Sequence, residues 1–250
     1  AAEVVQSLRV ADAGLICLSA KSGIVVGTEK GWKSLADANL PAMFYVSKLD
    51  EEHANYFAVL DALRDTFGAS VVPLSFPILH GEEAVGVVDV LTKKAYDASG
   101  KEIALTADAE EKIEEYMMSI NEQVAETDEE LMEKFFMEEP FTEEELCKGI
   151  KAGLQQRSVT PVFCGCAASG LGTIELIENI IKYAPNPAEG KPMVAVDEDG
   201  NESEVKLDPS GSPMAFVFNT FADQYGKNSY FKVISGDMED TLTVTNVRTG

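Results

Sequence analysis

In the first part of the chain, short continuous apolar runs alternate with segments whose apolar residues recur at helical spacing. The runs cover residues 15–18, 42–46 and 71–74, and each is typical of a strand buried in a parallel sheet. Between the runs, the spacing around Trp32 and around Leu60 predicts helices. This alternation predicts an α/β fold in which helices cover the faces of a parallel sheet.

The middle of the chain breaks the alternation. Residues 84–91 predict a strand, and residues 106–145 combine helical spacing with 16 Asp or Glu against 2 Lys. Thr142 with Glu145 fits a capping box at the start of a helix. The pattern predicts an inserted helical subdomain with a buried and a solvated face. A solvated face without any partner is the simpler interpretation of its charges.

The sheet pattern then returns. Residues 159–164 predict another strand, and we expect Thr173 to cap the following helix and Pro185 to end it. The segment from residue 187 to 212 is rich in Pro, Gly and acids, which indicates a linker, with a hairpin turn at Asp199.

Beyond the linker, short strands are expected at residues 215–218, 230–233 and 242–244, separated by Gly and Asp turns. Such a series is typical of the opening of an antiparallel barrel. Too few residues follow to close one. The chain also begins Ala-Ala-Glu, without a Met, so we expect a piece of a longer protein.

Composition narrows the possible functions. The formal charge of −23 repels phosphate backbones and argues against direct nucleic-acid binding. No apolar run approaches the roughly 20 residues that a membrane span needs, so we expect no membrane association. The four cysteines have no metal-ligand spacing with the two His, so we predict reduced thiols, a cytoplasmic protein and no metal site. Cys17 and Cys164 fall in runs predicted to be buried strands.

The first candidate motif is Ser47-Lys48-Leu49-Asp50, which ends a predicted strand. A carboxylate in this position can accept hydrogen bonds from the N1 and N2 donors of guanine, a pair that adenine lacks. The Lys stem can cover the face of the base. An ordinary polar turn at a strand end is the alternative interpretation.

The second candidate motif is Cys164-Gly165-Cys166-Ala167, which also ends a predicted strand. Small residues in such a loop let backbone N–H groups approach a ligand carbonyl. A loop that merely contains small residues is the alternative. Because both motifs follow strands of one predicted sheet, they are expected at the edge where open α/β sheets bind ligands.

Taken in chain order, these motifs resemble those of translational GTPases. The acidic insertion makes the sequence similar to elongation factor G, which carries an inserted subdomain called G prime at this place, whereas the related tetracycline-resistance ribosomal-protection proteins lack it. The stretches that carry the resemblance are residues 3–13 (the helix after the D-x-P-G loop), 23–29 with Trp32, 47–50 (the N-K-x-D motif), 161–167 (the S-A-[LK] motif), 183–187 (the exit from the G domain) and 216–236 (the start of the barrel domain).

The resemblance implies a partial P-loop GTPase fold, with an α/β parallel sheet, an acidic helical insertion and the first strands of an antiparallel β-barrel. The implied domains are residues 1–80 (second half of the G domain), 81–155 (the G-prime insertion), 156–186 (the last strand and helix of the G domain), 187–212 (linker) and 213–250 (start of domain II).

The resemblance also implies a function: GTP-dependent action on the ribosome as an elongation factor in translocation, with GTP or GDP and Mg²⁺ as cofactors of the full-length protein. It assigns guanine contacts to Ser47, Lys48, Asp50, Cys166 and Ala167. Ser47 stands where the family has Asn, and Cys166 where it has Ser. Asp50 is present, so selectivity for guanine is expected to remain. The side chain of Ser47 is shorter than that of Asn, and we expect this difference to affect the affinity for the nucleotide.

The phosphate-binding half of such a site is missing from the sequence. No G-x-x-x-x-G-K-[ST] occurs, and the family's D-x-P-G loop and water-positioning His would precede Ala1. We therefore predict GTP hydrolysis by the full-length protein, but no catalytic residue and no tightly bound cofactor in this chain. The alternatives are a non-hydrolysing paralogue that acts as an acidic interaction module, or a ribosomal-protection-type factor.

The acidic insertion is the candidate surface for a protein partner. Helical spacing places Glu111 and Glu115 on one face, with Glu114 beside them, and their negative field would steer a basic partner. In elongation factor G the corresponding subdomain meets the C-terminal domain of the ribosomal stalk protein. The resemblance therefore implies that domain as the partner of these three glutamates.

Overall fold

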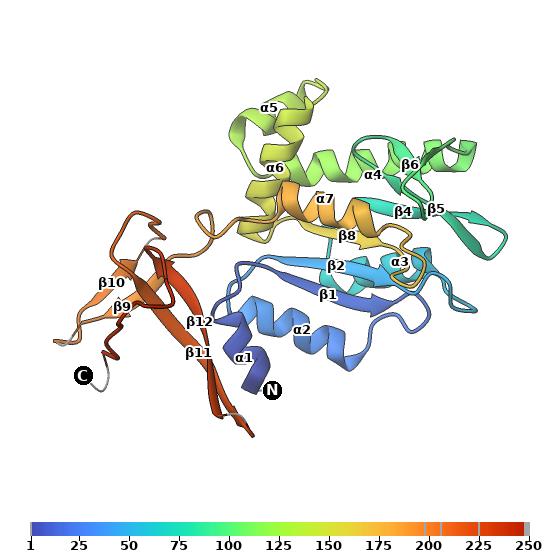
Figure 1. The fold of residues 1–250 in the computed structure, drawn as a ribbon. Helices are drawn as coiled ribbons and strands as arrows, with labels where there is room; N and C mark the ends of the chain where they lie inside the picture. Colours follow the sequence, from blue (N-terminus) through green and yellow to red (C-terminus); the bar gives the residue numbers. More distant parts are fainter. Residues whose placement is uncertain (1, 198, 206, 225, 248–250) are drawn as a thin grey trace. The chain divides into compact units, whose positions relative to one another are not determined.

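The computed structural model describes residues 2–197, 199–205, 207–224 and 226–247, which form two compact units (Figure 1). The larger unit comprises Ala13–Pro185, and the smaller one comprises Ala1–Asp12 together with Asn186–Gly250. The helix at the start of the chain thus groups with the strands at its end.

A four-stranded parallel sheet in the order β1-β2-β8-β3 organises the larger unit. The four apolar runs found in the sequence form these strands, which confirms the prediction. The prediction that Cys17 lies in a buried position is wrong, because the residue is exposed. The reason is that β1 is an outer strand, covered less completely than its neighbours. The strands are β1 (Gly14–Ser19), β2 (Ala42–Ser47), β3 (Val71–Pro73) and β8 (Thr160–Cys164).

Helices pack against this sheet as the sequence spacing predicted. Trp32, Phe44 and Phe67 form one aromatic cluster, with ring centroids between 4.8 and 5.6 Å apart. This cluster joins two helices to the central strand β2. The helices that follow the parallel strands are α2 (Val26–Asp37), α3 (Tyr56–Phe67) and α7 (Thr173–Tyr183).

The start of α7 differs from the prediction. Thr173 is the first helical residue, and the N-cap is Gly172, which has φ of 70°. A Cβ on Gly172 would lie 2.4 Å from the carbonyl oxygen of Cys164, so the tight turn requires glycine where a capping side chain was expected. The end of the helix at Tyr183, just before Pro185, is as predicted.

An antiparallel sheet precedes the acidic helices, and the sequence predicted only one of its strands. Its order is β4-β5-β6-β7, and β4 pairs with β5 from Ser75 opposite Asp89 to His80 opposite Glu83. The strands are β4 (Ser75–His80), β5 (Glu83–Asp89), β6 (Lys94–Tyr96) and β7 (Glu102–Ile103).

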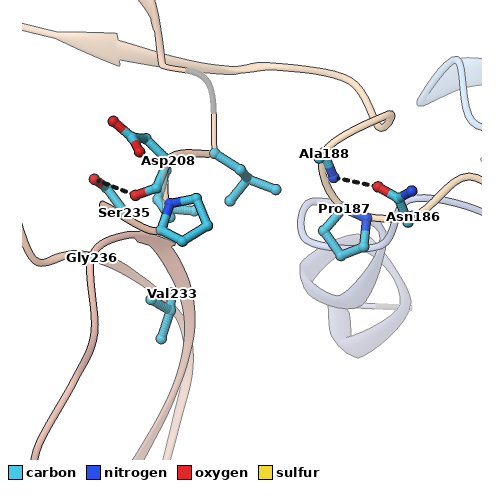
Figure 2. Close-up of a pocket in the computed structure, with 10 residues that line it drawn as sticks. Asn186, Pro187, Ala188, Asp208, Val233, Ser235 and Gly236 are labelled. Atoms are coloured by element: carbon cyan, nitrogen blue, oxygen red, sulfur yellow. Dashed lines mark hydrogen bonds between the residues drawn. The ribbon is translucent and has the colours of Figure 1, made fainter. Parts of the chain in front are cut away.

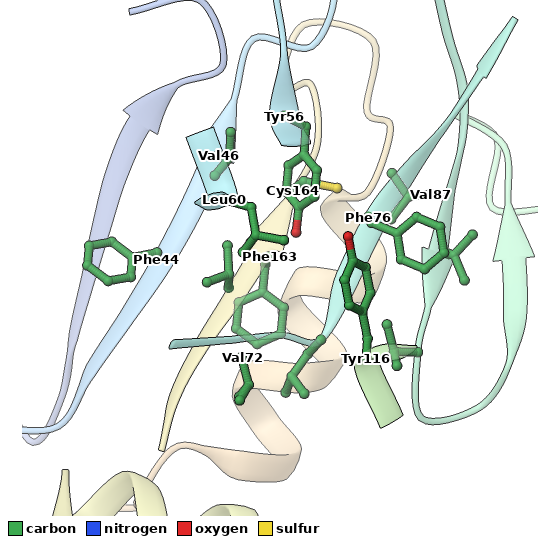
Figure 3. Packing of buried hydrophobic residues seen from close by; sticks show 14 of the residues in the cluster. Phe44, Val46, Tyr56, Leu60, Val72, Phe76, Val87, Tyr116, Phe163 and Cys164 are labelled. Carbon is green, nitrogen blue, oxygen red and sulfur yellow. The ribbon is translucent and has the colours of Figure 1, made fainter. Parts of the chain in front are cut away.

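The helical prediction for residues 106–145 is confirmed, including the capping box of Thr142 and Glu145. Lys134 forms an ion pair with Glu145, which lowers the pKa of that carboxyl to about 2. The insertion packs on the parallel sheet through residues such as Tyr116, and Figure 3 shows this ring in one cluster with Phe76 and Phe163. The helices are α4 (Ala107–Ala125), α5 (Glu129–Phe136) and α6 (Glu143–Gln156).

The smaller unit contains two antiparallel hairpins and the first helix, which packs against β11. The Lys232 ammonium lies 2.9 Å from the Val10 carbonyl oxygen and 3.1 Å from the Asp12 carboxylate, so it bonds the segment after the helix to β12. The elements are α1 (Ala2–Leu8), β9 (Met193–Val196), β10 (Glu202–Val205), β11 (Met214–Asp223) and β12 (Gly226–Ser235).

Two predictions for this unit have different outcomes. The hairpin turn at Asp199 is confirmed, because β9 and β10 pair across it. The strand expected at residues 242–244 is wrong: these residues are exposed and form no strand. No strand in the described part of the chain pairs with them, and an unpaired segment has no ladder to stabilise an extended conformation.

Candidate functional site

Three strands of the parallel sheet end side by side at Ser19, Ser47 and Cys164. Backbone hydrogen bonds join the loops that follow: the Ala20 amide donates to the Ser47 carbonyl at 2.8 Å, and the Gly165 amide donates to the Val46 carbonyl at 3.1 Å. This is the edge at which open α/β sheets bind ligands. The loops form one continuous surface on which the two sequence motifs lie.

The loop after β2 presents two of its motif residues to solvent. Lys48 is exposed and has φ of 62°, whereas Leu49 is buried and anchors the loop. Asp50 is exposed. The Lys48 ammonium lies 2.7 Å from the Glu51 carboxylate, an exposed pair of the kind that adds little stability and that a ligand can displace.

Ser47 has a different orientation. Its hydroxyl donates to the Leu18 carbonyl at 3.1 Å, so the group that stands in for the family's Asn amide is engaged with strand β1. This bond ties two neighbouring strand ends together.

The two motifs meet at Asp50 and Cys166. A hydrogen bond with the Cys166 side chain is the main cause that lowers the pKa of Asp50, followed by the Asp50 backbone N–H and the Lys48 charge. The thiol of Cys166 is the donor in that bond, and its side chain is buried. Asp50 is therefore ionised in the neutral range and offers acceptor oxygens to a pair of donors.

The loop after β8 is compact and internally bonded. The Cys166 amide donates to the Leu171 carbonyl at 2.8 Å, and the Gly170 amide donates to the Cys166 carbonyl at 3.0 Å. Gly165 is required because a Cβ there would lie 2.4 Å from the Leu171 carbonyl oxygen. Ala167, next in the chain, is exposed. The loop thus holds Cys166 inside and Ala167 outside.

Two buried polar residues behind these loops were not singled out from the sequence. The Tyr56 hydroxyl donates to the Ser75 carbonyl at 2.7 Å, and the Ser75 hydroxyl oxygen accepts from the Cys164 amide at 2.9 Å. These partners are far apart in the sequence, so no local motif could indicate the contact.

The three glutamates proposed as a partner surface lie on α4. Glu111, Glu114 and Glu115 are all exposed. Lys112, the lysine of this helix, turns toward α3, with its ammonium 4.5 Å from the centroid of the Phe57 ring. The outer face of α4 therefore keeps its negative charge.

Neither a metal cluster nor a long apolar helix is found in the described part of the chain. No group of three or more His, Cys, Asp or Glu side chains there could hold a metal ion. Within the same ranges, none of the helices combines the length and the apolar character that crossing a bilayer requires.

A cavity of about 330 Å³ lies in the smaller unit (Figure 2). Polar groups that line it bond to one another: the Ser235 hydroxyl donates to the Asp208 carbonyl at 3.1 Å, and the Ala188 amide donates to the Asn186 side chain at 2.9 Å. None of the five residues predicted to contact guanine lines it.

Comparison with known proteins defines the class of this chain as a translational GTPase. The family model of the elongation factor Tu GTP binding domain matches residues 1–186. The chain belongs to that family, which confirms the resemblance to translational GTPases and the predicted G-domain fold. GTP binding and GTP hydrolysis are the activities of the family.

A solved structure agrees over most of the chain. A crystal structure of a protein from Thermus thermophilus superposes with a TM-score of 0.79 at 30% sequence identity. The match covers 94% of this chain and 33% of the other, so this chain spans about a third of that protein's length.

Proposed function

We propose that this chain is the guanine-reading part of an elongation factor G-like GTPase that acts on the ribosome in translocation, in the cytoplasm. The observation that carries the proposal is that both motifs follow neighbouring strand ends at the ligand-binding edge of the sheet, where the Gly165 amide donates to the Val46 carbonyl at 3.1 Å. Family membership supports a guanine nucleotide as the ligand.

Each motif residue has a defined part in this proposal. The Asp50 carboxylate accepts hydrogen bonds from the N1 and N2 donors of guanine, and the Lys48 stem covers one face of the base. The Ala167 backbone N–H donates to the base carbonyl, while Cys166 holds Asp50 in place. Ser47 contributes through strand β1, because its hydroxyl already bonds to Leu18.

The phosphates and Mg²⁺ would be bound by residues other than these. The described side chains include no acidic cluster that could hold a cation, so they do not fit a magnesium site. In a complete GTPase the γ-phosphate orders switch loops that relax after hydrolysis. The part assigned to this chain is recognition of the base.

The isolated 250-residue chain is expected to bind GTP too weakly to detect in the micromolar range. Most of the nucleotide's charge is on its phosphates, and the sequence lacks the glycine-rich backbone cradle that binds them. Isothermal titration with GTP and Mg²⁺ measures this directly. A submicromolar dissociation constant would contradict the assignment of base recognition alone to these residues.

The exposed glutamates of α4 support a second part of the proposal, contact with the C-terminal domain of the ribosomal stalk protein. Reversing Glu111, Glu114 and Glu115 to Lys should slow association with that domain by about tenfold or more, because it removes the field that steers a basic partner. Stopped-flow association at low and high salt is the measurement, and the wild-type rate should fall as salt rises.

A matched control separates the local field from total charge. Reversal of Glu202, Glu204 and Glu239, which are also exposed, changes net charge by the same amount outside α4. If both triple variants bind as fast as the wild type, the α4 surface is only a solvated helical face.

The acidic surface also favours an alternative function, a non-hydrolysing paralogue that acts as an interaction module. A ribosomal-protection-type factor is a further alternative, although that group lacks the insertion. Multiple-turnover phosphate release by the protein extended to include its upstream segment separates these functions. Hydrolysis stimulated by ribosomes supports a GTPase, whereas stalk binding without hydrolysis supports the module.

A further inference from the structure

A path of buried hydrogen bonds runs behind the two candidate guanine loops. It leads from the Tyr56 hydroxyl to the Ser75 carbonyl, at 2.7 Å, and from the Ser75 hydroxyl oxygen to the Cys164 amide, at 2.9 Å. Tyr56 and Ser75 are each only 2% exposed. Figure 3 shows Tyr56 and Cys164 within the core of the larger unit.

Strand β8 extends beyond the end of the neighbouring strand β3, so the last amide of β8 needs an acceptor from outside that strand. Strand β3 ends at Pro73, opposite Val162, and the Leu74 amide still donates to the Val162 carbonyl at 2.9 Å. The chain then departs into β4. The Ser75 side chain takes the position of a backbone acceptor and pairs with the Cys164 amide, which is the last one before the Gly165 turn.

The other end of the path reaches the Asp50 loop. Tyr56 is the first residue of α3, directly after that loop. The side chain of the preceding residue, Asn55, caps the helix by accepting from the Ala58 amide at 3.1 Å. The backbone N–H of Asn55 donates to the Ala20 carbonyl at 2.9 Å. Tyr56 therefore has a fixed position relative to the loops after β1 and β2.

Together these bonds form a closed circuit. From Val46 the chain leads through Asp50 to Tyr56, hydrogen bonds lead through Ser75 to Cys164, and the chain leads on to Gly165, whose amide donates to the Val46 carbonyl at 3.1 Å. The circuit includes the loop that carries Asp50 and ends at the start of the loop that carries Cys166. Loss of one of the buried bonds is therefore expected to change the separation of the two loops.

We propose that Tyr56 and Ser75 are positioning residues that set the placement of Asp50 against Cys166 and thereby the selectivity for guanine. This inference rests on the proposed guanine site. Neither residue touches the base. Each acts through the backbone that it holds, and Ser75 also links the site to the antiparallel sheet, because it is the first residue of β4.

Ser75→Ala and Tyr56→Phe test the inference through base selectivity. The readout is the ratio of affinities for GDP and IDP, whose base lacks the 2-amino donor, in the protein extended to include its phosphate-binding segment. We expect each variant to reduce the ratio by about threefold to tenfold, since a lost hydrogen bond to a buried partner has an effect of this size. Ser75→Ala should have the larger effect because it leaves the Cys164 amide unpaired.

Two control variants keep the inference separate from the proposed function. Tyr183→Phe removes the hydroxyl of an equally buried tyrosine outside the circuit and should leave the ratio unchanged. Asp50→Asn should abolish the preference. If the wild type shows no preference for GDP, the proposed site fails; if Asp50→Asn acts as expected and the two circuit variants do not, only the inference fails.

Amide hydrogen exchange in the 250-residue chain provides an independent measurement. In Ser75→Ala the Cys164 and Gly165 amides should exchange about tenfold faster, while amides between β1 and β2 keep their wild-type rates. Tyr56→Phe retains the ring and its packing, so it keeps the test valid if Ser75→Ala fails to fold. A folded Tyr56→Phe variant with unchanged exchange and an unchanged GDP to IDP ratio would overturn the inference.

Discussion

Replacing Asp50 by Asn should shift the base preference of the protein, extended to include its phosphate-binding segment, from GTP toward XTP. An amide offers one acceptor and one donor group, so it leaves a guanine donor unpaired at a cost of about 1–3 kcal/mol. Xanthine presents a carbonyl where guanine has its amino group, and the new amide can donate to it. Competition between GTP and XTP for the wild-type and variant proteins measures the shift.

The charge state of Asp50 predicts how the base preference depends on pH. The hydrogen bond from Cys166 holds the pKa of Asp50 below its ordinary value, so the carboxylate stays ionised throughout the neutral range and the wild-type preference should be flat there. Glu52→Gln, at an exposed carboxylate of the same loop, is the matched control. An unchanged GTP-over-XTP preference in Asp50→Asn would show that this motif does not read the base.

The parallel sheet could be predicted from the sequence because its strands are continuous apolar runs bounded by turns. In the antiparallel sheet, β5 was predicted, whereas β6 and β7 could not be, because they span only residues 94–96 and 102–103. Segments this short carry too few residues to show a period. The exposure of Cys17 was missed for a related reason: a run of apolar residues does not reveal whether a strand is central or outermost.

The candidate site shows the same division. Asp50 and Cys166 were found because each lies in a short contiguous motif at a strand end. Tyr56 and Ser75 were not found, because their bonds join residues 19 and 89 positions apart in the sequence. Nothing in the local sequence marks either residue as buried, and only the folded structure shows that they connect α3 to the end of β8.

Gly165→Ala should destabilise the chain and disorder the second loop. The added Cβ would lie 2.4 Å from the Leu171 carbonyl oxygen and 2.6 Å from the Tyr45 hydroxyl, both closer than van der Waals contact permits. The Leu171 carbonyl is itself held by the Cys166 amide at 2.8 Å. Relief of the clash therefore breaks a loop hydrogen bond, and overpacking of this kind costs about 1–3 kcal/mol. Urea unfolding of the 250-residue chain measures the loss.

Two further variants identify the source of that loss. Gly27→Ala adds a methyl group on α2, where the nearest atom would lie 3.9 Å away, and should be neutral or stabilising by up to about 1 kcal/mol because alanine favours helices. Tyr45→Phe combined with Gly165→Ala removes the clash with the hydroxyl but keeps the clash with the Leu171 backbone, so most of the loss should remain. Full recovery in the double variant would place the constraint in the Tyr45 side chain. A Gly165→Ala chain as stable as the wild type would mean that the loop moves freely, and a loop that moves freely could not hold Cys166 against Asp50 as base selection requires.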